Sequence, residues 1–387
     1  MRRIRAAART MLKHLALVLI SLGVTLALVE VALAINGRYN SLAAPNLAES
    51  DAIWEPRANS RSEMRHHDLD VMIEARFDAQ GVRNHSALST ERKRNIVGVF
   101  GDSFTENTSM DDQFVFTSLL DSITGSRVRV VNYGVAGYGL DQAYLRYRKY
   151  AKHDMRHVVY LFCDNDLRNL YETGLAEITP EHEVVFRAPR VHPVRRFLGR
   201  LRVTYLALRG YYQIVGILSK GETPHLKSLE QGGDSAWVAR RKTQAARYHD
   251  AFADAVARDF LSERPRAETL QLSRTFLLVL EQWQREVTSR SRTFTVLVLP
   301  GRLVTEVAGK LLREFDGRVI YLGQDYGEYD AFKFRNDGHW NEYGNLRAAE
   351  IIANHPDVPF HDDIVDPALL EGWKPRIDEY YREHASR

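Results

Sequence analysis

Short apolar runs rich in β-branched residues alternate with segments of helical spacing, and this rhythm constrains the fold more than any other feature of the chain. The apolar runs lie at 95–100, 128–133, 158–162, 294–299 and 319–322. Helical spacing is found at 113–122, 141–152, 269–287 and 341–354. Because parallel strands are buried on both faces, this alternation is typical of a sheet covered by helices on each side. The sequence therefore predicts an α/β domain with a central parallel sheet.

The composition is that of an ordinary globular protein. Of the 387 residues, 44% are hydrophobic and 27% are charged, which suits one large domain or two small ones. The formal net charge of +3 is too small to indicate a nucleic-acid partner. The single cysteine, Cys163, excludes an internal disulfide framework and any metal site built from several cysteines.

The N-terminus carries a membrane signal. Residues 1–14 form a basic segment without acids, which is predicted to stay in the cytoplasm. Residues 15–35 are almost wholly apolar apart from Glu30, and this is about the 20-residue length that a spanning helix needs. Two interpretations stay open, a single-pass anchor in the inner membrane or a signal peptide cleaved near 32–34. In a bacterium, either one places the folded part in the periplasm.

The rest of the chain divides into a core with three additions. Residues 36–94 are predicted to be an N-terminal extension, in which Trp54 and 75–83 have the pattern of a packed strand and turn. The main domain is expected at 95–360, with an insertion at 170–265 that we expect to be largely helical. The tail at 361–387 is expected to end in an exposed helix.

A basic cluster lies within the insertion. Its members are Arg195, Arg196, Arg200 and Arg202. Two interpretations stay open, a surface for anionic lipid or an acidic glycan, and a solvated helix face.

Four polar segments stand at the ends of predicted strands or the starts of helices. They are Gly101-Asp102-Ser103-Phe104, Asn132-Tyr133-Gly134-Val135-Ala136-Gly137, Asp164-Asn165-Asp166 and Asp337-Gly338-His339-Trp340. Open α/β sheets bind ligands at the carboxyl edge of the strands, where these segments meet. Ser103 is the candidate nucleophile there, and its backbone N–H is a candidate oxyanion donor. The alternative for Ser103 is a plain helix N-cap.

Gly137 and Asn165 complete a candidate oxyanion hole. Gly137 follows a glycine-rich turn that lets the backbone approach a ligand, and Asn165 offers a side-chain amide. The alternatives are a structural turn for Gly137 and an Asx turn for Asn165. A phosphate loop is disfavoured because the lysine and Ser/Thr of that motif do not follow the glycines.

His339 and Asp337 supply the base and its carboxylate. His339 can take the proton of Ser103 and return it to a leaving alcohol. Asp337, two residues earlier, can bond the far ring nitrogen and fix the tautomer. The other histidines, such as His66, His67, His153 and His157, have no comparable setting. Cys163 has no assigned base and is expected to be a packed small residue.

These four segments resemble the blocks of the SGNH, or GDSL-type, hydrolase superfamily over about 95–354. The resemblance implies a flavodoxin-like three-layer α/β/α sandwich and metal-free, cofactor-free acyl transfer. It assigns Ser103, Asp337 and His339 to catalysis, and Ser103, Gly137 and Asn165 to the oxyanion hole. Cys163 stands where the family usually has glycine. The Asp-x-His-Trp spacing is similar to that of alginate acetylation proteins in the same superfamily.

Four functions follow as hypotheses. The first is an extracytoplasmic ester hydrolase that acts on O-acyl groups, such as O-acetyl groups, of a cell-envelope glycan. The second is an O-acyltransferase that moves the acyl group to a polysaccharide, and the third is a non-catalytic glycan-binding component of an envelope assembly. The fourth is a metal-dependent phosphoesterase built on Asp102, Asp164, Asp337 and His339, for which the ligands are too few.

Overall fold

The computed structural model describes most of the chain, and every structural statement below concerns the described residues. These are 13–14, 17–18, 20–21, 23–32, 47–69, 71–83, 95–124, 128–150, 155–179, 181, 183–187, 255–325, 329–335 and 337–385. The chain forms two compact units, Met1–Pro45 with Arg190–Gly233, and Asn46–Pro189 with Asp234–Arg387. The second unit contains the sheet and the candidate site.

A five-stranded parallel sheet lies at the centre of the second unit, as the alternation of apolar runs predicts. Its strands are β5 (Asn95–Phe100), β6 (Val128–Asn132), β7 (Met155–Phe162), β10 (Thr293–Val298) and β11 (Arg318–Tyr321). They are ordered β11-β10-β7-β5-β6, and every neighbouring pair is parallel. Counted along the chain this is the order 2-1-3-4-5, the flavodoxin-like arrangement.

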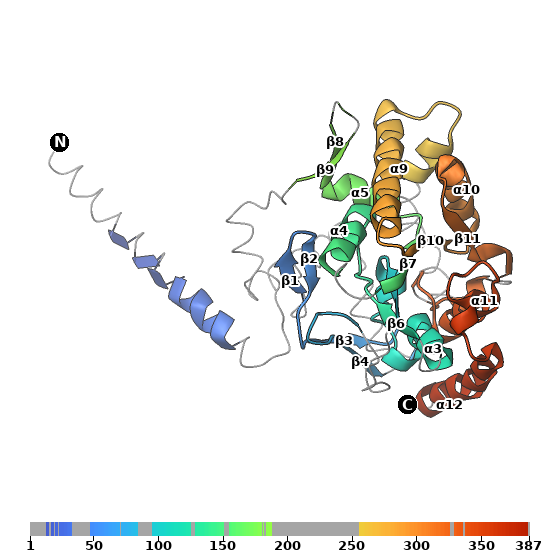
Figure 1. Ribbon diagram of the computed structural model, residues 1–387. Coiled ribbons are helices and arrows are strands. Elements are labelled where there is room, and N and C mark those ends of the chain that lie inside the picture. Colours follow the sequence, from blue (N-terminus) through green and yellow to red (C-terminus); the bar gives the residue numbers. More distant parts are fainter. Residues whose placement is uncertain are drawn as a thin grey trace. The chain divides into compact units, whose positions relative to one another are not determined.

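Helices cover both faces of the sheet (Figure 1). Besides the helical residues 255–261, the α-helices described in this unit are α2 (Ser103–Glu106), α3 (Phe116–Ile123), α4 (Leu140–Tyr150), α5 (Asp166–Thr173), α9 (Ala267–Thr288), α10 (Arg302–Leu311), α11 (Glu342–Asn354) and α12 (Trp373–Ala385). The 3₁₀ segments are η2 (Asp112–Phe114), η4 (Leu312–Glu314), η5 (Leu322–Asp325), η6 (Tyr329–Phe332), η7 (His361–Asp363) and η8 (Pro367–Gly372). Helices α3 and α11 pack together in one layer, whereas α4, α5 and α9 pack together in another.

The core lies between the sheet and these helices. Strand β7 is buried along nearly its whole length, as expected for the central strand of a doubly covered sheet. Trp283 of α9 is fully buried, meets Phe100 of the sheet edge to face and packs at a tilt against Tyr160. Large aromatic side chains of this kind supply much of the apolar area that folding buries.

The N-terminal extension forms two small antiparallel hairpins. Strands β1 (Leu47–Ser50) and β2 (Ile53–Pro56) make the first, and β3 (Arg61–Arg65) and β4 (Met72–Arg76) make the second. An isolated bridge from Phe77 to Arg83 closes the turn after β4, in agreement with the strand and turn predicted at 75–83.

The predicted insertion is not wholly helical. After α5 the chain forms the antiparallel hairpin β8 (Ala176–Ile178) and β9 (Val184–Phe186), which the sequence analysis did not predict. Val184 is buried and Phe186 stacks edge to face on Tyr144 of α4. Residues 255–261 are helical, and the basic cluster at 195–202 lies outside the described residues.

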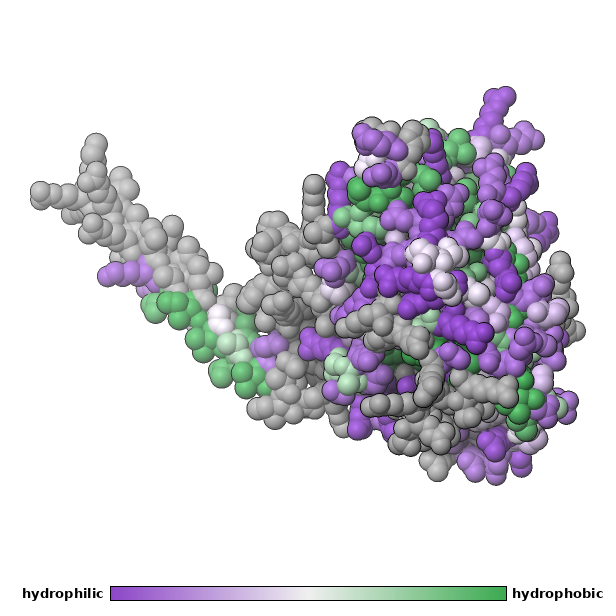
Figure 2. Space-filling model, viewed as in Figure 1, coloured by the Kyte–Doolittle hydropathy of each residue, from purple (hydrophilic) through white to green (hydrophobic). Residues whose placement is uncertain are grey.

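The described parts of the predicted membrane segment, within 17–32, are helical, and their apolar side chains are exposed (Figure 2). Among the residues that the structure describes, no helix is both long and apolar enough to cross a membrane. The span at 15–35 stays a prediction.

One buried contact joins the N-terminal extension to the C-terminal part of the domain. His66, in the β3–β4 loop, lies 2.9 Å from Oε1 of Glu342, and both side chains are fully buried. His66 Nδ1 accepts the backbone N–H groups of Asp68 and Leu69, each at 3.0 Å. The ring proton must therefore lie on Nε2, which donates to Glu342. The other oxygen of Glu342 accepts the hydroxyl of Tyr381 of α12 at 2.7 Å.

We expect His66→Ala to lower the free energy of unfolding by about 3 kcal/mol, because it leaves a buried carboxylate without one of its donors. Urea denaturation of the full chain measures the change. The matched control is His361→Ala, an exposed histidine whose loss should cost less than about 0.5 kcal/mol. Equal stabilities of the two variants would contradict the structural role of His66.

Candidate active site

Ser103 stands at the start of α2, shortly after strand β5, which is the neighbour of the central strand β7. The helix is capped by Asp102, whose Oδ1 accepts the Phe104 N–H at 2.9 Å. The N-cap alternative for Ser103 is therefore wrong, because the cap is the preceding residue. The loop after β6 packs tightly against this turn, since a side chain on Gly134 would meet the backbone nitrogen of Glu106 at 2.6 Å. The Ser103 hydroxyl is left to contact a partner from elsewhere in the chain.

That partner comes from a loop between η6 and α11. The loop is closed by a bridge between Lys333 and Trp340 and by the Phe334 N–H, which donates to the His339 carbonyl at 3.0 Å. Trp340 is fully buried and meets Phe104 edge to face at 5.5 Å between ring centroids. Asn341 caps α11 by accepting the Gly344 N–H. These contacts fix the loop that carries Asp337 and His339.

The structure brings Ser103, His339 and Asp337 into one hydrogen-bonded chain. His339 Nε2 lies 2.7 Å from Ser103 Oγ, and His339 Nδ1 lies 2.5 Å from Asp337 Oδ1. The same Asp337 oxygen accepts the backbone N–H of His339 at 3.0 Å. Both ring nitrogens are therefore engaged in the pattern of a nucleophile, a base and an orienting carboxylate.

The surroundings keep Asp337 ionised and make His339 more basic than an ordinary histidine. Burial by itself raises the pKa of Asp337, but hydrogen bonds from His339 and His67 outweigh it and hold that pKa well below its usual value. Burial by itself lowers the pKa of His339, but the hydrogen bond and charge of Asp337, with the charge of Asp102, raise it above its usual value. A pair with this polarity stabilises an imidazolium once the ring has taken a proton.

This polarity predicts the pH dependence of any reaction in which His339 is the base. The ring accepts a proton only when neutral, so kcat/KM should fall as the pH falls through the pKa of His339. Because that pKa is raised, the acidic midpoint should lie above about 6.5, the usual value for histidine. Hydrolysis rates of p-nitrophenyl acetate from about pH 5 to about pH 9 measure it. An acidic midpoint below the usual value would contradict the arrangement.

Gly137 lies in an exposed turn beside the Ser103 turn. Its φ is +78°, a left-handed conformation that favours glycine. Upstream in the same loop, the Val135 N–H donates to the Gly101 carbonyl at 3.1 Å, and the Ala136 N–H donates to Glu106 at 2.8 Å. The loop is therefore fastened to both ends of the segment that carries Ser103.

Asn165 stands at the carboxyl end of β7 and is joined to the same turn. Its side chain makes no capping hydrogen bond to α5. Instead, its Nδ2 donates to Asp102 Oδ2 at 3.0 Å. An amide nitrogen carries two protons, so a second one is available for a developing oxyanion. The Asx-turn alternative does not describe this side chain.

We expect Asn165→Ala to lower kcat by about 10²–10³, the usual effect of removing one oxyanion donor, with little change in KM. Turnover of p-nitrophenyl acetate measures both constants. Asn354→Ala, which removes an exposed amide at the end of α11, is the control and should behave as the unmodified protein. An unchanged kcat in Asn165→Ala would remove this residue from the candidate oxyanion hole.

The sequence analysis missed one residue of the site. His67 was expected to have no comparable setting, and this is wrong, since its Nε2 lies 3.0 Å from Oδ2 of Asp337 and 3.0 Å from Oγ of Ser109. The only signal in the sequence is the run His66-His67-Asp68, three side chains capable of hydrogen bonding in a polar extension.

Trp54 of β2 also reaches the site region. Its Cζ2 lies 3.5 Å from the point where a side chain on Gly137 would begin. The extension at 36–94 therefore supplies side chains to the candidate site as well as preceding the domain.

The surroundings of Cys163 and Asp102 favour neither a nucleophilic thiol nor a metal ligand. Cys163 is buried, and burial together with nearby carboxylates raises the pKa of its thiol well above the usual value. Each carboxylate oxygen of Asp102 already accepts a hydrogen bond. Within the described part of the chain, no group of three or more His, Cys, Asp and Glu side chains is arranged to hold a metal ion.

Comparisons with known proteins find solved structures with a distant likeness to this chain. No family model matches the chain, and no curated protein matches it. A solved structure from Desulfitobacterium hafniense DCB-2, assigned to the G-D-S-L family of lipolytic proteins, is 10% identical with a TM-score of 0.34. It covers 67% of this chain and 99% of its own. LAE5, an alpha/beta hydrolase enzyme from the metagenome of Lake Arreo in Spain, is 11% identical with a TM-score of 0.29, and the match covers 66% of this chain and 92% of LAE5. At this level of similarity the comparisons carry no argument about family or activity, and the function has to be inferred from the geometry of the site.

Proposed function

We propose that this protein is a serine-dependent ester hydrolase that works through an acyl-enzyme. The observation that carries the proposal is the chain of contacts from Ser103 Oγ through His339 to Asp337, at 2.7 Å and 2.5 Å. Ser103 follows strand β5, whereas Asp337 and His339 lie on a loop more than two hundred residues later. Their alignment suits transfer of a proton from the hydroxyl to the imidazole.

In the first half of the reaction, Ser103 Oγ attacks the carbonyl carbon of the ester while His339 Nε2 takes the hydroxyl proton. The carbonyl oxygen gains negative charge, which the backbone N–H groups of Ser103 and Gly137 and the amide of Asn165 would accept. The intermediate then expels the alcohol, which leaves with the proton from His339. The acyl group remains on Ser103.

In the second half, water replaces the alcohol. His339 takes a proton from the water as its oxygen attacks the acyl carbon, and then returns that proton to Ser103 as the acid leaves. Asp337 holds the Nδ1–H tautomer through both halves and stabilises the imidazolium. Every proton therefore passes through the one nitrogen that faces Ser103.

For the substrate, we propose O-acyl esters, such as O-acetyl groups, of a cell-envelope glycan. The support is the sequence of the N-terminus, where a basic segment precedes the apolar stretch at 15–35. On this proposal the domain works in the periplasm, tethered to the inner membrane or released by cleavage. Transfer of the acyl group to a sugar hydroxyl would use the same residues, so acyl release with and without a glycan acceptor separates hydrolase from transferase.

Turnover of p-nitrophenyl acetate by the full chain tests the hydrolase proposal. We expect the unmodified protein to release p-nitrophenol and acetate, and Ser103→Ala to show no turnover above the uncatalysed rate while unfolding at the same temperature. Equal rates for the two proteins would overturn the proposal. Full biological function of Ser103→Ala with retained glycan binding would favour a non-catalytic binding role instead.

A further inference from the structure

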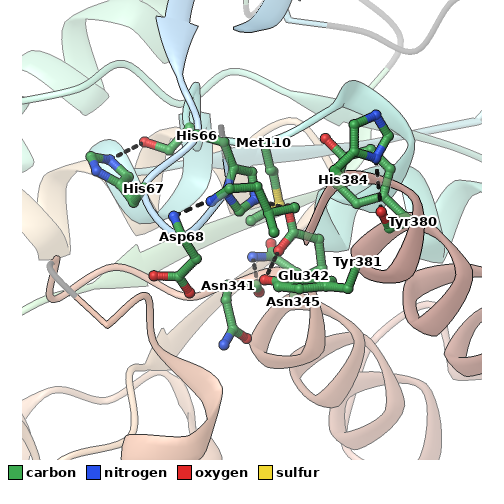
Figure 3. Close-up of polar contacts among 12 residues, drawn as sticks. His66, His67, Asp68, Met110, Asn341, Glu342, Asn345, Tyr380, Tyr381 and His384 are labelled. Atoms are coloured by element: carbon green, nitrogen blue, oxygen red, sulfur yellow. Dashed lines mark hydrogen bonds and ion pairs between the residues drawn. The ribbon is translucent and has the colours of Figure 1, made fainter. Parts of the chain in front are cut away.

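His67 lies in the β3–β4 loop, and its neighbours His66 and Asp68 form hydrogen bonds with the segment 335–342 that contains His339. In the β3–β4 loop, His66 donates to Glu342 at the start of α11. Asp68 accepts the backbone N–H of Arg335 at 2.8 Å, two residues before Asp337. Figure 3 shows His66 directed towards Glu342 and Tyr381, with the His67 ring pointing away from them. Three consecutive residues therefore contact three points between 335 and 342.

We propose that His67 is a positioning residue that holds the second carboxylate oxygen of Asp337, and so keeps the first one on His339. The inference rests on the proposed function, since it assigns His67 a part in the same reaction. It extends the chain of contacts to Ser103, His339, Asp337 and His67, with the last member supplied by the N-terminal extension.

The direction of the hydrogen bond follows from the partners. An ionised Asp337 can only accept, so His67 Nε2 must carry a proton and donate to Oδ2 at 3.0 Å. Ser109 Oγ lies 3.0 Å from the same nitrogen and is itself 3.4 Å from Met64 Sδ. The serine can therefore give its own proton to the sulfur and share the Nε2 proton with the carboxylate.

A carboxylate two residues from its histidine needs such a second support. Asp337 and His339 lie on one short loop, so their relative orientation depends on that loop alone unless an outside group fixes it. Asp337 Oδ1 already accepts hydrogen bonds from the ring and from the backbone N–H of His339. A donor on Oδ2 stops the carboxylate from rotating about its terminal bond. The His67 ring is itself packed, at 5.2 Å between its centroid and that of buried Phe334.

Four substitutions of the full chain test this role. His67→Gln keeps an N–H near the position of Nε2. His67→Asn has the same amide on a side chain that is too short to reach Asp337. His67→Phe keeps the ring without the donor. Asp337→Asn is combined with His67→Phe in a double-mutant cycle. Each protein is assayed for kcat and KM with p-nitrophenyl acetate, for the rate of its Ser103 adduct with a fluorophosphonate by intact mass, and for its unfolding temperature.

We expect His67→Phe and His67→Asn to lower kcat and the adduct rate by about 10- to 100-fold, the range for losing a hydrogen bond to a charged group, with KM nearly unchanged. His67→Gln should recover most of this loss. With Asp337→Asn already present, His67→Phe should cost less than about twofold more, because the carboxylate it positions is gone.

The proposal is overturned if His67→Asn and His67→Gln behave alike, or if His67→Phe costs as much beside Asp337→Asn as alone. The exposed His361→Phe serves as the control for replacing a histidine by phenylalanine. Failure of the proposed function is a separate result, namely an unmodified protein that neither turns over the ester nor forms an adduct absent from Ser103→Ala.

Discussion

Replacement of His339 by alanine is expected to lower kcat by about 10⁶-fold, because removing the base costs as much as removing the whole catalytic group in a serine enzyme. His339 Nε2, at 2.7 Å, is the one base that contacts the Ser103 hydroxyl among the described residues. Stopped assays with p-nitrophenyl acetate over long incubations measure the residual rate. The unfolding temperature should change little, because the ring is only half-buried.

The control for this experiment is another histidine with a packed ring. His157 lies near the amino end of the central strand β7, with its Nδ1 2.7 Å from Thr293 Oγ1, and it has no contact with the candidate site. His157→Ala should therefore retain kcat even where it lowers stability. A His339→Ala protein within about tenfold of the unmodified rate would show that another group takes the Ser103 proton.

Replacement of Asp337 by asparagine is expected to lower kcat by about 10⁴-fold with the loop geometry kept. The amide carries no charge to stabilise the imidazolium, and with its N–H₂ group facing Nδ1 it favours the tautomer that carries the proton on Nε2. His339 would then present an N–H to Ser103 and could not act as the base. Because the low pKa of Asp337 keeps it ionised, this effect should persist across the neutral pH range.

Asp164→Asn provides the comparison for that substitution. Asp164 was named with Asp337 in the metal-site hypothesis, and its Oδ1 lies 3.2 Å from Cys163 Sγ. If catalysis depended on metal ligands, Asp164→Asn and Asp337→Asn would lower kcat together and chelators would lower it further. We expect the large loss in Asp337→Asn alone.

The sheet and most helices were predictable because their signals are local. Strands β5, β7 and β10 contain the apolar runs predicted as strands, and the predicted 269–287 helix is α9, Ala267–Thr288. The N-cap of α11 was also readable from Asn341, whose side chain accepts from the third residue along. Hairpin β8–β9 was missed, since its strands have three residues each and too little pattern to recognise.

The site was predictable only in part, for a physical reason that His67 illustrates. Ser103, Asn165 and Asp337 each follow a strong local signal, the end of a strand or the start of a helix. His67 lies in a hairpin loop of the polar extension, and its contact with Asp337 spans 270 positions of sequence. Nothing in the spacing of the extension indicates which edge of the sheet its loop will reach, so only the folded chain reveals the contact.

The most direct test of the account is the site of covalent modification by a fluorophosphonate. The full chain is incubated with the probe, weighed intact and then mapped by peptide mass spectrometry, beside Ser103→Ala and His339→Ala. The account predicts one adduct, on Ser103, that is absent from Ser103→Ala and strongly slowed in His339→Ala. An adduct on another residue, or none on a folded protein that turns over p-nitrophenyl acetate, would contradict Ser103 as the nucleophile.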